Sequence, residues 1–505
     1  MTTSLLLQPR WDAPTTPFRH TWEEVINVDQ YRWMVRHDML EQLSLLQREL
    51  GARHVRAVGM FDDEMRVLCP GPESTAAPAE PRPARTNWQI VDYVWDELLA
   101  RGLSPMFTTS FIPSRLASGP ITVFTTRGHT SPPRDYREWG GLVSEAVRHA
   151  IDRYGLAAVR GWYFEVWNEP NLQGWFWGAD QAEFWKLWAV TYRAIKEVDA
   201  GLRIGGPSTA RAEWIADFVE FSRRNDCLPD YLTLHIYNND GEAVALAPFA
   251  GPQEDKAGTS PNLAAGVIRG ARQLADELGF KGEIHFNEWG SSWRGYEPAR
   301  ESASEAAFIV RTMAEVSQAA DQFAYWCVSD IYDQVGYGRE TFHGNYGLLN
   351  LHGLRKPSYH AFALLKRLGQ QRVEVAGGGI DPFQGTICTR GADSAHLLVY
   401  AYRHEPNPVP HEMRVEVELP AGSGNRLTLH RVDSRENNVL ARWRALGAPT
   451  YLHPRERAAL AAVDALQPSA VPVTVLHRDG RCFATFAMES PGIALLTIPG
   501  PVLIP

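Results

Sequence analysis

The chain has 505 residues, more than a single compact core normally serves, so at least two domains are expected. At 44% hydrophobic and 22% charged residues, its composition is that of a globular protein, and no apolar stretch is long enough to span a membrane. The net charge of −9 and the lack of Lys/Arg-rich runs argue against nucleic acid or an anionic membrane surface as a partner.

The five cysteines are scattered, odd in number and free of any CxxC pair, which argues against a structural zinc site and favours a reduced compartment. The N-terminal MTTSLLLQPRW has no basic residue before its short leucine run and does not resemble a signal peptide. We therefore expect a cytoplasmic protein. The 17 Trp residues serve core packing for the most part, and a subset could stack on sugar rings.

Strand-like and helix-like patterns alternate over the first 365 or so residues. The strand candidates are Trp22–Val28, His54–Phe61, Ser104–Phe111, Trp162–Trp167, Arg203–Gly206, Tyr231–Tyr237, Glu283–Glu288 and Gln322–Val328. The clearest helix candidates are Asp38–Leu50, Trp88–Arg101, Tyr136–Tyr154, Gln181–Val198, Leu263–Leu278, Ala303–Ala319 and Ser358–Leu368. A Pro/Ala/Glu-rich insertion, Pro70–Pro83, is expected to be a surface loop.

About eight strand and helix units favour an α/β fold of the (β/α)8 barrel type over an open doubly wound sheet. After residue 370 the pattern changes to strands separated by Gly, Pro and Asn turns, with one helical piece at Pro454–Ala465. The sequence thus predicts a catalytic barrel over residues 18–369 and an all-β sandwich over residues 370–505. The N-terminal segment 1–17 is expected to join the β-domain.

Two glutamates end strands of this predicted barrel, where the chemistry of such barrels takes place. Glu169 lies in Trp-Asn-Glu-Pro after the fourth strand, and Glu288 lies in Phe-Asn-Glu-Trp at the end of the seventh. Hydrolysis of a glycosidic bond needs one carboxyl group to protonate the leaving oxygen and a second to attack or to activate water. A lone glutamate at a strand end is usually a cap or an ion-pair partner, but a matched pair predicts a glycosidase.

The residues around Glu169, Phe164–Leu172 (FEVWNEPNL), resemble the acid/base motif of glycoside hydrolase family 39. Further segments resemble the same family and extend the likeness from about residue 35 to residue 369. They are Ser110–Gly119, Pro132–Trp139, Gly205–Pro207, Tyr325–Asp330, Phe342–Gly344 and Tyr346–Leu349. The resemblance implies a retaining glycosidase of the β-xylosidase type that needs no metal and no cofactor.

Carried over to this sequence, the resemblance implies that Glu169 is the general acid/base and Glu288 the nucleophile. Asn168 would bind the sugar 2-hydroxyl, and Tyr237 would hold the Glu288 carboxylate with support from His235. The remaining substrate-binding residues implied are Trp326, beneath the sugar ring, and Phe342 and His343, at the entrance. Retention requires carboxyl groups about 5–5.5 Å apart, whereas inversion requires roughly 6.5–9.5 Å.

Two positions depart from the family pattern and bear on sugar specificity. Val58 stands where family β-xylosidases carry a histidine, and Tyr296-Glu297-Pro298 replaces a segment that usually contains His-Asp. A missing polar contact to a sugar hydroxyl can change selectivity strongly. Long loops after Met60, Ser110, Asn171 and Val328 are expected to close one end of the groove and to favour exo-action on short xylo-oligosaccharides.

Three alternatives stay open at this point. The first is a family 39 enzyme of other specificity, such as an α-L-iduronidase or an arabinoside-cleaving enzyme. An iduronidase must bind a carboxylate and would need a cationic pocket, for which Arg294 and Arg339 are the candidates. A carbohydrate-binding barrel without activity is the second alternative. The third, metal-assisted hydrolysis, finds only weak ligand spacing in His343, His352, Asp330 and Asp333. An oligosaccharide substrate is the expected partner, and an oligomer is possible.

Overall fold

The computed structural model describes residues 3–68, 86–241, 245–246, 261–334, 336, 338–377, 383–405, 408–423 and 426–500. The predicted surface loop Pro70–Pro83 lies outside these residues. The chain divides into two compact units. Residues 22–290 and 319–337 form the first, called the barrel unit here; residues 1–21, 291–318 and 338–505 form the second, the β-sheet unit.

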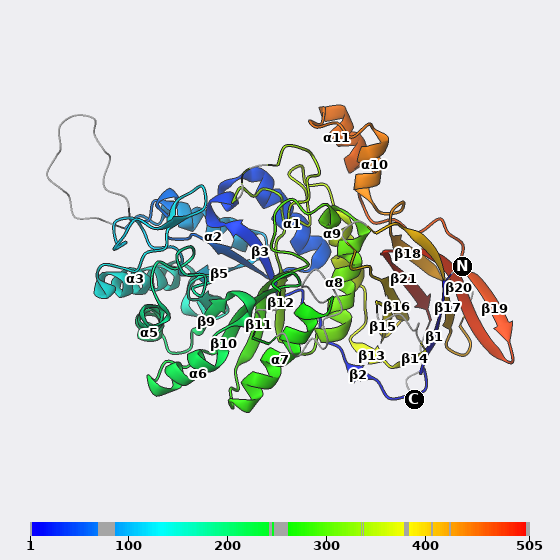
Figure 1. Ribbon diagram of the computed structural model, residues 1–505, viewed down its shortest axis with the longest axis horizontal. Helices are drawn as coiled ribbons and strands as arrows, with labels where there is room; N and C mark the ends of the chain where they lie inside the picture. Colours follow the sequence, from blue (N-terminus) through cyan, green and yellow to red (C-terminus); the bar gives the residue numbers. More distant parts are fainter. Residues whose placement is uncertain are drawn as a thin grey trace. The chain divides into compact units, whose positions relative to one another are not determined.

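The barrel unit is built on one eight-stranded parallel sheet (Figure 1). Its strands are β3 (Val25–Gln30), β4 (His54–Val58), β5 (Ser104–Thr108), β8 (Tyr163–Glu165), β9 (Arg203–Thr209), β10 (Tyr231–Tyr237), β11 (Glu283–Gly290) and β12 (Gln322–Tyr325). The last strand lies beside the first, and Val328 N donates to Asn27 O at 2.9 Å. The predicted (β/α)8 barrel is therefore confirmed.

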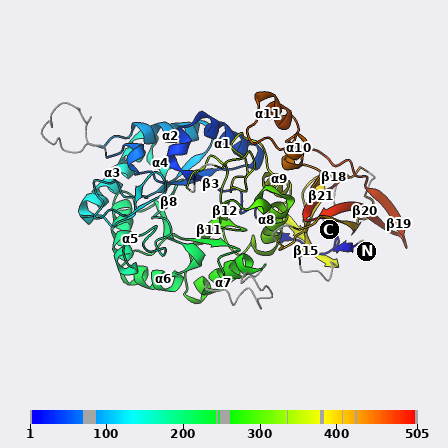
Figure 2. The same ribbon diagram turned by 45° about the horizontal axis from the view of Figure 1, so that its top comes forward.

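Helices of this unit lie outside the ring of strands (Figure 2). They are α1 (His37–Leu50), α2 (Gln89–Ala100), α3 (Tyr136–Tyr154), α4 (Leu156–Val159), α5 (Gln181–Lys196), α6 (Ile215–Arg224) and α7 (Leu263–Glu277). Asp180 caps α5, since its side chain accepts from Glu183 N at 2.8 Å. Helix α6 was not among the helix candidates named from the sequence; its buried side chains include Ile215, Phe218 and Val219.

Strand irregularities occur at the level of the predicted site. Between β10 and β11 the register passes from Leu234↔Phe286 to His235↔Glu288, so Asn287 is an extra residue in β11. Between β10 and β9 it passes from Thr233↔Pro207 to Leu234↔Thr209, so Ser208 is an extra residue in β9. Such bulges redirect side chains. In β11, the consecutive residues Asn287 and Glu288 both reach the barrel interior, where Asn287 donates to Glu165 and Glu288 accepts from Arg56.

Two sheets form the β-sheet unit. One contains β1 (Thr3–Pro9), β14 (Val375–Gly377), β17 (His411–Glu418), β19 (Thr474–Arg478) and β20 (Arg481–Ser490). The other contains β2 (Thr16–Pro17), β13 (Gln371–Val373), β15 (Gln384–Arg390), β16 (Ser394–Ala401), β18 (Thr428–Val432) and β21 (Gly492–Pro499). Leu7 and Val415 from the first sheet and Leu397 and Leu496 from the second share one buried core, so the predicted all-β sandwich is confirmed.

The N-terminal strand β1 pairs in parallel with β17 of this sandwich. The unit also includes α8 (Ala303–Val316), α9 (Pro357–Leu365), α10 (Val439–Ala445) and α11 (Pro454–Ala461). Helix α8 contacts β15, β16 and β21, which groups this part of the chain with the sheets although its sequence lies between two barrel strands.

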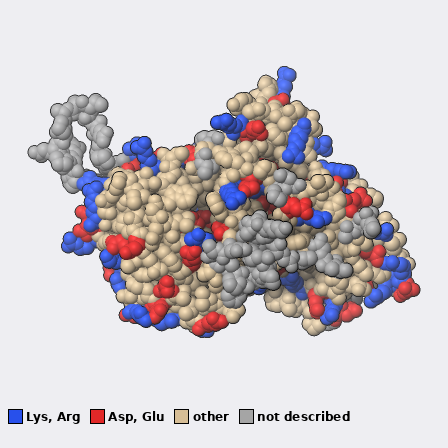
Figure 3. Space-filling model, viewed as in Figure 1, with Lys and Arg blue, Asp and Glu red and all other residues tan. Residues whose placement is uncertain are grey.

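Within the described part of the chain, no helix is both long and apolar enough to cross a membrane. Basic and acidic side chains are interspersed on the face drawn in Figure 3, and neither sign forms a continuous patch there.

Candidate active site

Arg56 is the centre of a buried polar network at the inner end of the barrel site. It projects from β4, and its side chain is fully buried. A guanidinium carries five N–H donors, and each has an acceptor here. The acceptors are Glu165 (from Nε, 2.6 Å), Glu288 and Asn27 (from Nη1, 2.8 and 3.3 Å), and Asn168 and His235 (from Nη2, 2.8 and 3.5 Å). Arg56 therefore fixes the positions of groups from several strands at once.

Glu288 lies on β11, and both of its oxygens have donors. Oε1 accepts from Arg56, and Oε2 accepts from the Tyr237 hydroxyl at 3.1 Å. His235 Nδ1 is 3.5 Å from Oε2. A carboxylate that accepts from a guanidinium and a phenol is stabilised in its ionised form. Tyr237 thus makes the contact that the sequence resemblance implied for it.

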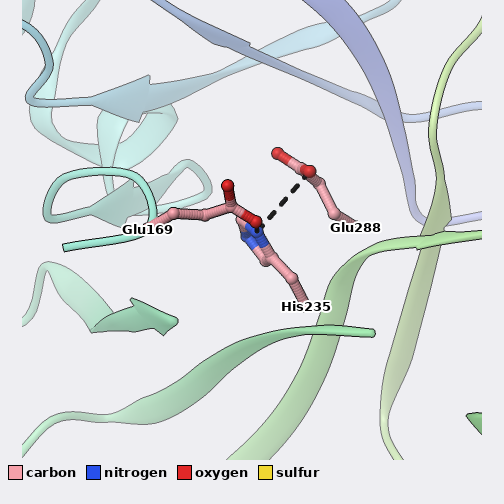
Figure 4. Close-up of side chains that lie close together, drawn as sticks. All are labelled: Glu169, His235 and Glu288. Carbon is pink, nitrogen blue, oxygen red and sulfur yellow. Dashed lines mark hydrogen bonds and ion pairs between the residues drawn. The ribbon is translucent and has the colours of Figure 1, made fainter. Parts of the chain in front are cut away.

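Glu169 faces Glu288 across the site (Figure 4). In the segment after β8, Trp167 at φ 71° and Glu169 at φ 47° both have left-handed backbone conformations. Glu169 Oε1 is 3.0 Å from His235 Nδ1. Within the described residues, Glu169 has no contact with an arginine like that of Glu288. One oxygen of Glu169 and one of Glu288 lie within 4.8 Å of each other.

Burial raises the pKa of Glu169 to about 7, against the opposing positive charges of Arg56 and Arg211. Burial also raises the pKa of Glu288, while His235 and Arg56 lower it. Because the guanidinium contacts Glu288 and not Glu169, Glu288 is the carboxyl that keeps the negative charge when the two share one proton. Burial lowers the pKa of His235 to about 4, so this imidazole is neutral near pH 7.

The hydrogen bonds assign the tautomer of His235. Arg56 can only donate, so Nε2 of His235 accepts and Nδ1 carries the proton. Nδ1 then donates to Glu169. Glu169, His235 and Glu288 also form a group that could hold a metal ion by spacing alone. A protonated Nδ1 has no lone pair to offer, and the pattern fits a pair of carboxyls joined by a neutral donor better than it fits a cation.

Asn168 and Trp326 lie in the barrel unit with the two glutamates. Asn168 Oδ1 accepts from Arg56, which leaves its Nδ2 directed away from the guanidinium and available to donate. Trp326 follows β12, is 5% exposed, and its N donates to Trp289 O at 3.1 Å.

Phe342 and His343 belong to the β-sheet unit. There Phe342 packs on Trp443, with ring centroids 5.4 Å apart, and His343 Nδ1 is 3.0 Å from Glu340 O. Their assignment to substrate binding stays a prediction.

Sequence reasoning missed the network beneath the two glutamates. Arg56, Glu165 and Asn27 were not among the predicted site residues, although each interrupts an apolar strand: HVRAV, YFEV and VINV. A charged or amide residue within a strand whose neighbours are apolar is the signal that could have identified them, because parallel barrel strands are otherwise buried and hydrophobic.

The chain matches the model of glycosyl hydrolases family 39 over residues 7–480. It is 32% identical to a β-xylosidase of Caldicellulosiruptor saccharolyticus, over 86% of this chain and 86% of that protein. It is 28% identical to a β-xylosidase of Geobacillus stearothermophilus, over 95% and 93%. The crystal structure of a monomeric β-xylosidase from Caulobacter crescentus CB15 superposes with a TM-score of 0.84 at 28% identity, covering 99% of both chains. This protein is therefore a member of glycosyl hydrolase family 39.

Proposed function

We propose that this enzyme is an exo-acting β-xylosidase that removes xylose from short xylo-oligosaccharides by double displacement. The observation that carries the proposal is the pair Glu169 and Glu288, whose nearest oxygens lie within 4.8 Å and whose partners differ. That limit on the distance between the nearest oxygens supports the close pair that retention needs, at about 5–5.5 Å, over the roughly 6.5–9.5 Å of inversion. Relatives of this chain at 28–32% identity are β-xylosidases, which supports xylose as the sugar.

In the first step, the Glu288 carboxylate attacks the anomeric carbon, and Glu169 gives its proton to the glycosidic oxygen as the bond to the leaving group breaks. The products are a glycosyl ester on Glu288 and a free alcohol. A pKa of about 7 lets Glu169 hold this proton near neutral pH.

In the second step, Glu169 is ionised and takes a proton from water, whose oxygen attacks the anomeric carbon. The ester bond to Glu288 breaks, and xylose leaves with its original configuration. The negative charge returns to Glu288, where Arg56 and Tyr237 receive it. Asn168, held by Arg56, would donate from Nδ2 to the sugar 2-hydroxyl, and Trp326 would lie beneath the ring.

Val58 is the first residue to test for specificity. It lies two residues after Arg56 on β4 and is 1% exposed, so strand alternation directs both side chains to the barrel axis. An apolar group at this position offers no hydrogen bond to a sugar hydroxyl. It therefore favours substrates that have no hydroxyl in need of a partner at this point.

We also propose that the enzyme acts in the cytoplasm. The described cysteines, Cys227, Cys327, Cys388 and Cys482, are free thiols, which supports a reducing compartment. Detection of the enzyme outside the cell membrane on cell fractionation would contradict this.

The function is tested by hydrolysis of a panel of nitrophenyl glycosides by the wild type and by the Glu169→Ala and Glu288→Ala variants. We expect the highest kcat/KM on the β-xyloside, loss of activity in Glu288→Ala, and azide rescue of Glu169→Ala with formation of the β-xylosyl azide. Cleavage of another glycoside with the same behaviour of the variants would keep the mechanism and change the sugar. Internal cleavage of long xylans in preference to short oligosaccharides would contradict exo-action.

A further inference from the structure

A third buried carboxylate, Glu165, shares Arg56 with Glu288. It is the last residue of β8 and is 0% exposed. Its Oε2 accepts from Arg56 Nε at 2.6 Å and from Thr108 Oγ1 at 3.4 Å. Its Oε1 accepts from Ser208 Oγ at 2.8 Å and from Asn287 Nδ2. The roles assigned to Glu169 and Glu288 leave Glu165 without a function in the reaction.

The two residues that donate to Oε1 are the extra residues of the two strand bulges. Ser208 is the extra residue of β9, at φ 57°, and Asn287 is the extra residue of β11. A left-handed conformation at a residue other than glycine costs about 1 kcal/mol or more. The strands on either side of β10 thus depart from regular geometry at the residues that satisfy the Glu165 carboxylate, which marks it as more than a packing residue.

Glu165 and Glu288 share the charge of one guanidinium. Within the described residues, these two are the carboxylates that contact Arg56. The stronger of the two attractions on Arg56 comes from Glu165, and together they hold the pKa of Arg56 above its usual value in spite of burial. Since Glu165 already balances the single positive charge, Glu288 receives one N–H of Arg56. Its other donor, Tyr237, and His235, whose Nδ1 is 3.5 Å away, are neutral.

We propose that Glu165 is a positioning residue that orients Arg56 and neutralises it, so that the nucleophile Glu288 is held by the guanidinium without being paired to its full charge. A carboxylate that is the sole anionic partner of a guanidinium is less basic and a weaker nucleophile. One that has lost Arg56 while the charge of Glu165 remains beside it would be harder to ionise in a buried site. Glu165 sets the balance between these limits. This inference rests on the roles proposed above for Glu169 and Glu288.

The proposal predicts the pH profile of kcat/KM, whose acid limb reports ionisation of Glu288 in the free enzyme. The titratable and charged groups that face Glu288 are Arg56 from β4, His235 and Tyr237 from β10, and Glu169 after β8. In Glu165→Gln, Arg56 keeps its charge and loses its nearest anion. The pKa of Glu288 should then fall, and the acid limb should move down by about one pH unit.

Glu165→Gln can be accommodated locally. Asn287 Oδ1 is buried and has no hydrogen-bond partner among the described residues. Rotation of the Asn287 amide by 180° therefore presents an acceptor to the new amide N–H, and the Ser208 hydroxyl can likewise turn to accept. Ser208→Ala is the matched control, because it removes a hydrogen bond to the same carboxylate and leaves the charge in place. We expect no displacement of the acid limb in Ser208→Ala, whatever its activity.

A double variant, Arg56→Gln with Glu165→Gln, keeps the net charge of the site and removes both members of the ion pair. We expect its acid limb to stay within about half a pH unit of wild type, whereas Arg56→Gln alone should raise it by about one unit or more. This comparison decides the question even if Glu165→Gln does not fold.

An acid limb that stays in place in Glu165→Gln, with activity reduced as in Ser208→Ala, would overturn the proposal and leave Glu165 a purely structural role. If the acid limb of the double variant moves up as far as that of Arg56→Gln, the proposal is overturned as well. Arg56 would then stabilise the charge of Glu288 to the same extent with or without Glu165. All profiles are measured on the glycoside that the wild type cleaves best. If the wild type cleaves none, or if Glu288→Ala stays active, the proposed function fails and not this inference.

Discussion

Replacing Glu169 with Gln is expected to stabilise the protein, and to do so more strongly as the pH rises. Burial raises the pKa of this carboxyl from its usual 4.5 to about 7 in the folded enzyme. A raised pKa in the folded state means that the unfolded chain releases the proton first. The cost to folding is therefore absent below pH 4.5, grows as the pH rises, and is complete above pH 7. A glutamine of the same shape does not titrate and has no such cost.

The size of the effect follows from the two pKa values. Their difference corresponds to about 3.4 kcal/mol in full, at 1.36 kcal/mol per pH unit. At pH 5 the wild type bears about 0.8 kcal/mol of this cost, and at pH 8 nearly all of it, so the advantage of Glu169→Gln grows by about 2.5 kcal/mol between these values. For a protein of this length that is a rise in Tm of about 2 °C, or about 4 °C if the barrel unit unfolds by itself.

The measurement is thermal unfolding of wild type and Glu169→Gln at pH 5, 6, 7 and 8 in buffers of equal ionic strength. Glu412→Gln, an exposed glutamate on β17, serves as the control and should show no pH-dependent gain. The reasoning is refuted if the difference in Tm between wild type and Glu169→Gln is the same at every pH. A gain that decreases toward pH 8 would reverse the sign and would mean that Glu169 is better solvated when ionised.

Further predictions concern activity. Wild-type kcat/KM on xylo-oligosaccharides, whose leaving group must be protonated, should fall as the pH rises through about 7, the pKa of Glu169. Glu169→Ala, assayed on a nitrophenyl xyloside that needs little help from an acid, should show no such fall. Tyr237→Phe removes a 3.1 Å hydrogen bond to Glu288 and should lower kcat/KM by about 10- to 100-fold while the acid limb moves up; an unchanged limb would deny the contact. Asn168→Ala should slow hydrolysis of a xyloside by about 100-fold and that of its 2-deoxy analogue far less, and equal losses on both would exclude a contact to the 2-hydroxyl. Val58→His should raise selectivity among pentosides, as compared by ratios of kcat/KM, and an unchanged ratio would place specificity elsewhere.

The sequence by itself determined the architecture and the two glutamates. Alternating patterns predicted the barrel, and strands such as Tyr231–Tyr237 and helices such as Tyr136–Tyr154 have the boundaries that were predicted. This works because amphipathic periodicity is a local property of the chain. Glu169 and Glu288 could be singled out as candidates because each is a carboxylate at or near the end of an apolar strand.

Only the tertiary structure decided how these two carboxyls differ. Both are glutamates with Asn before them, and local sequence assigns neither charge nor proton. Arg56, 232 positions before Glu288, contacts that carboxylate and not Glu169. Glu165 is the second carboxylate that pairs with the same guanidinium. The bulges at Ser208 and Asn287 are likewise invisible in the sequence, because an extra residue is defined only against the partner strand. Electrostatics in a buried site depends on distances between segments far apart in the chain, and folding alone sets those distances.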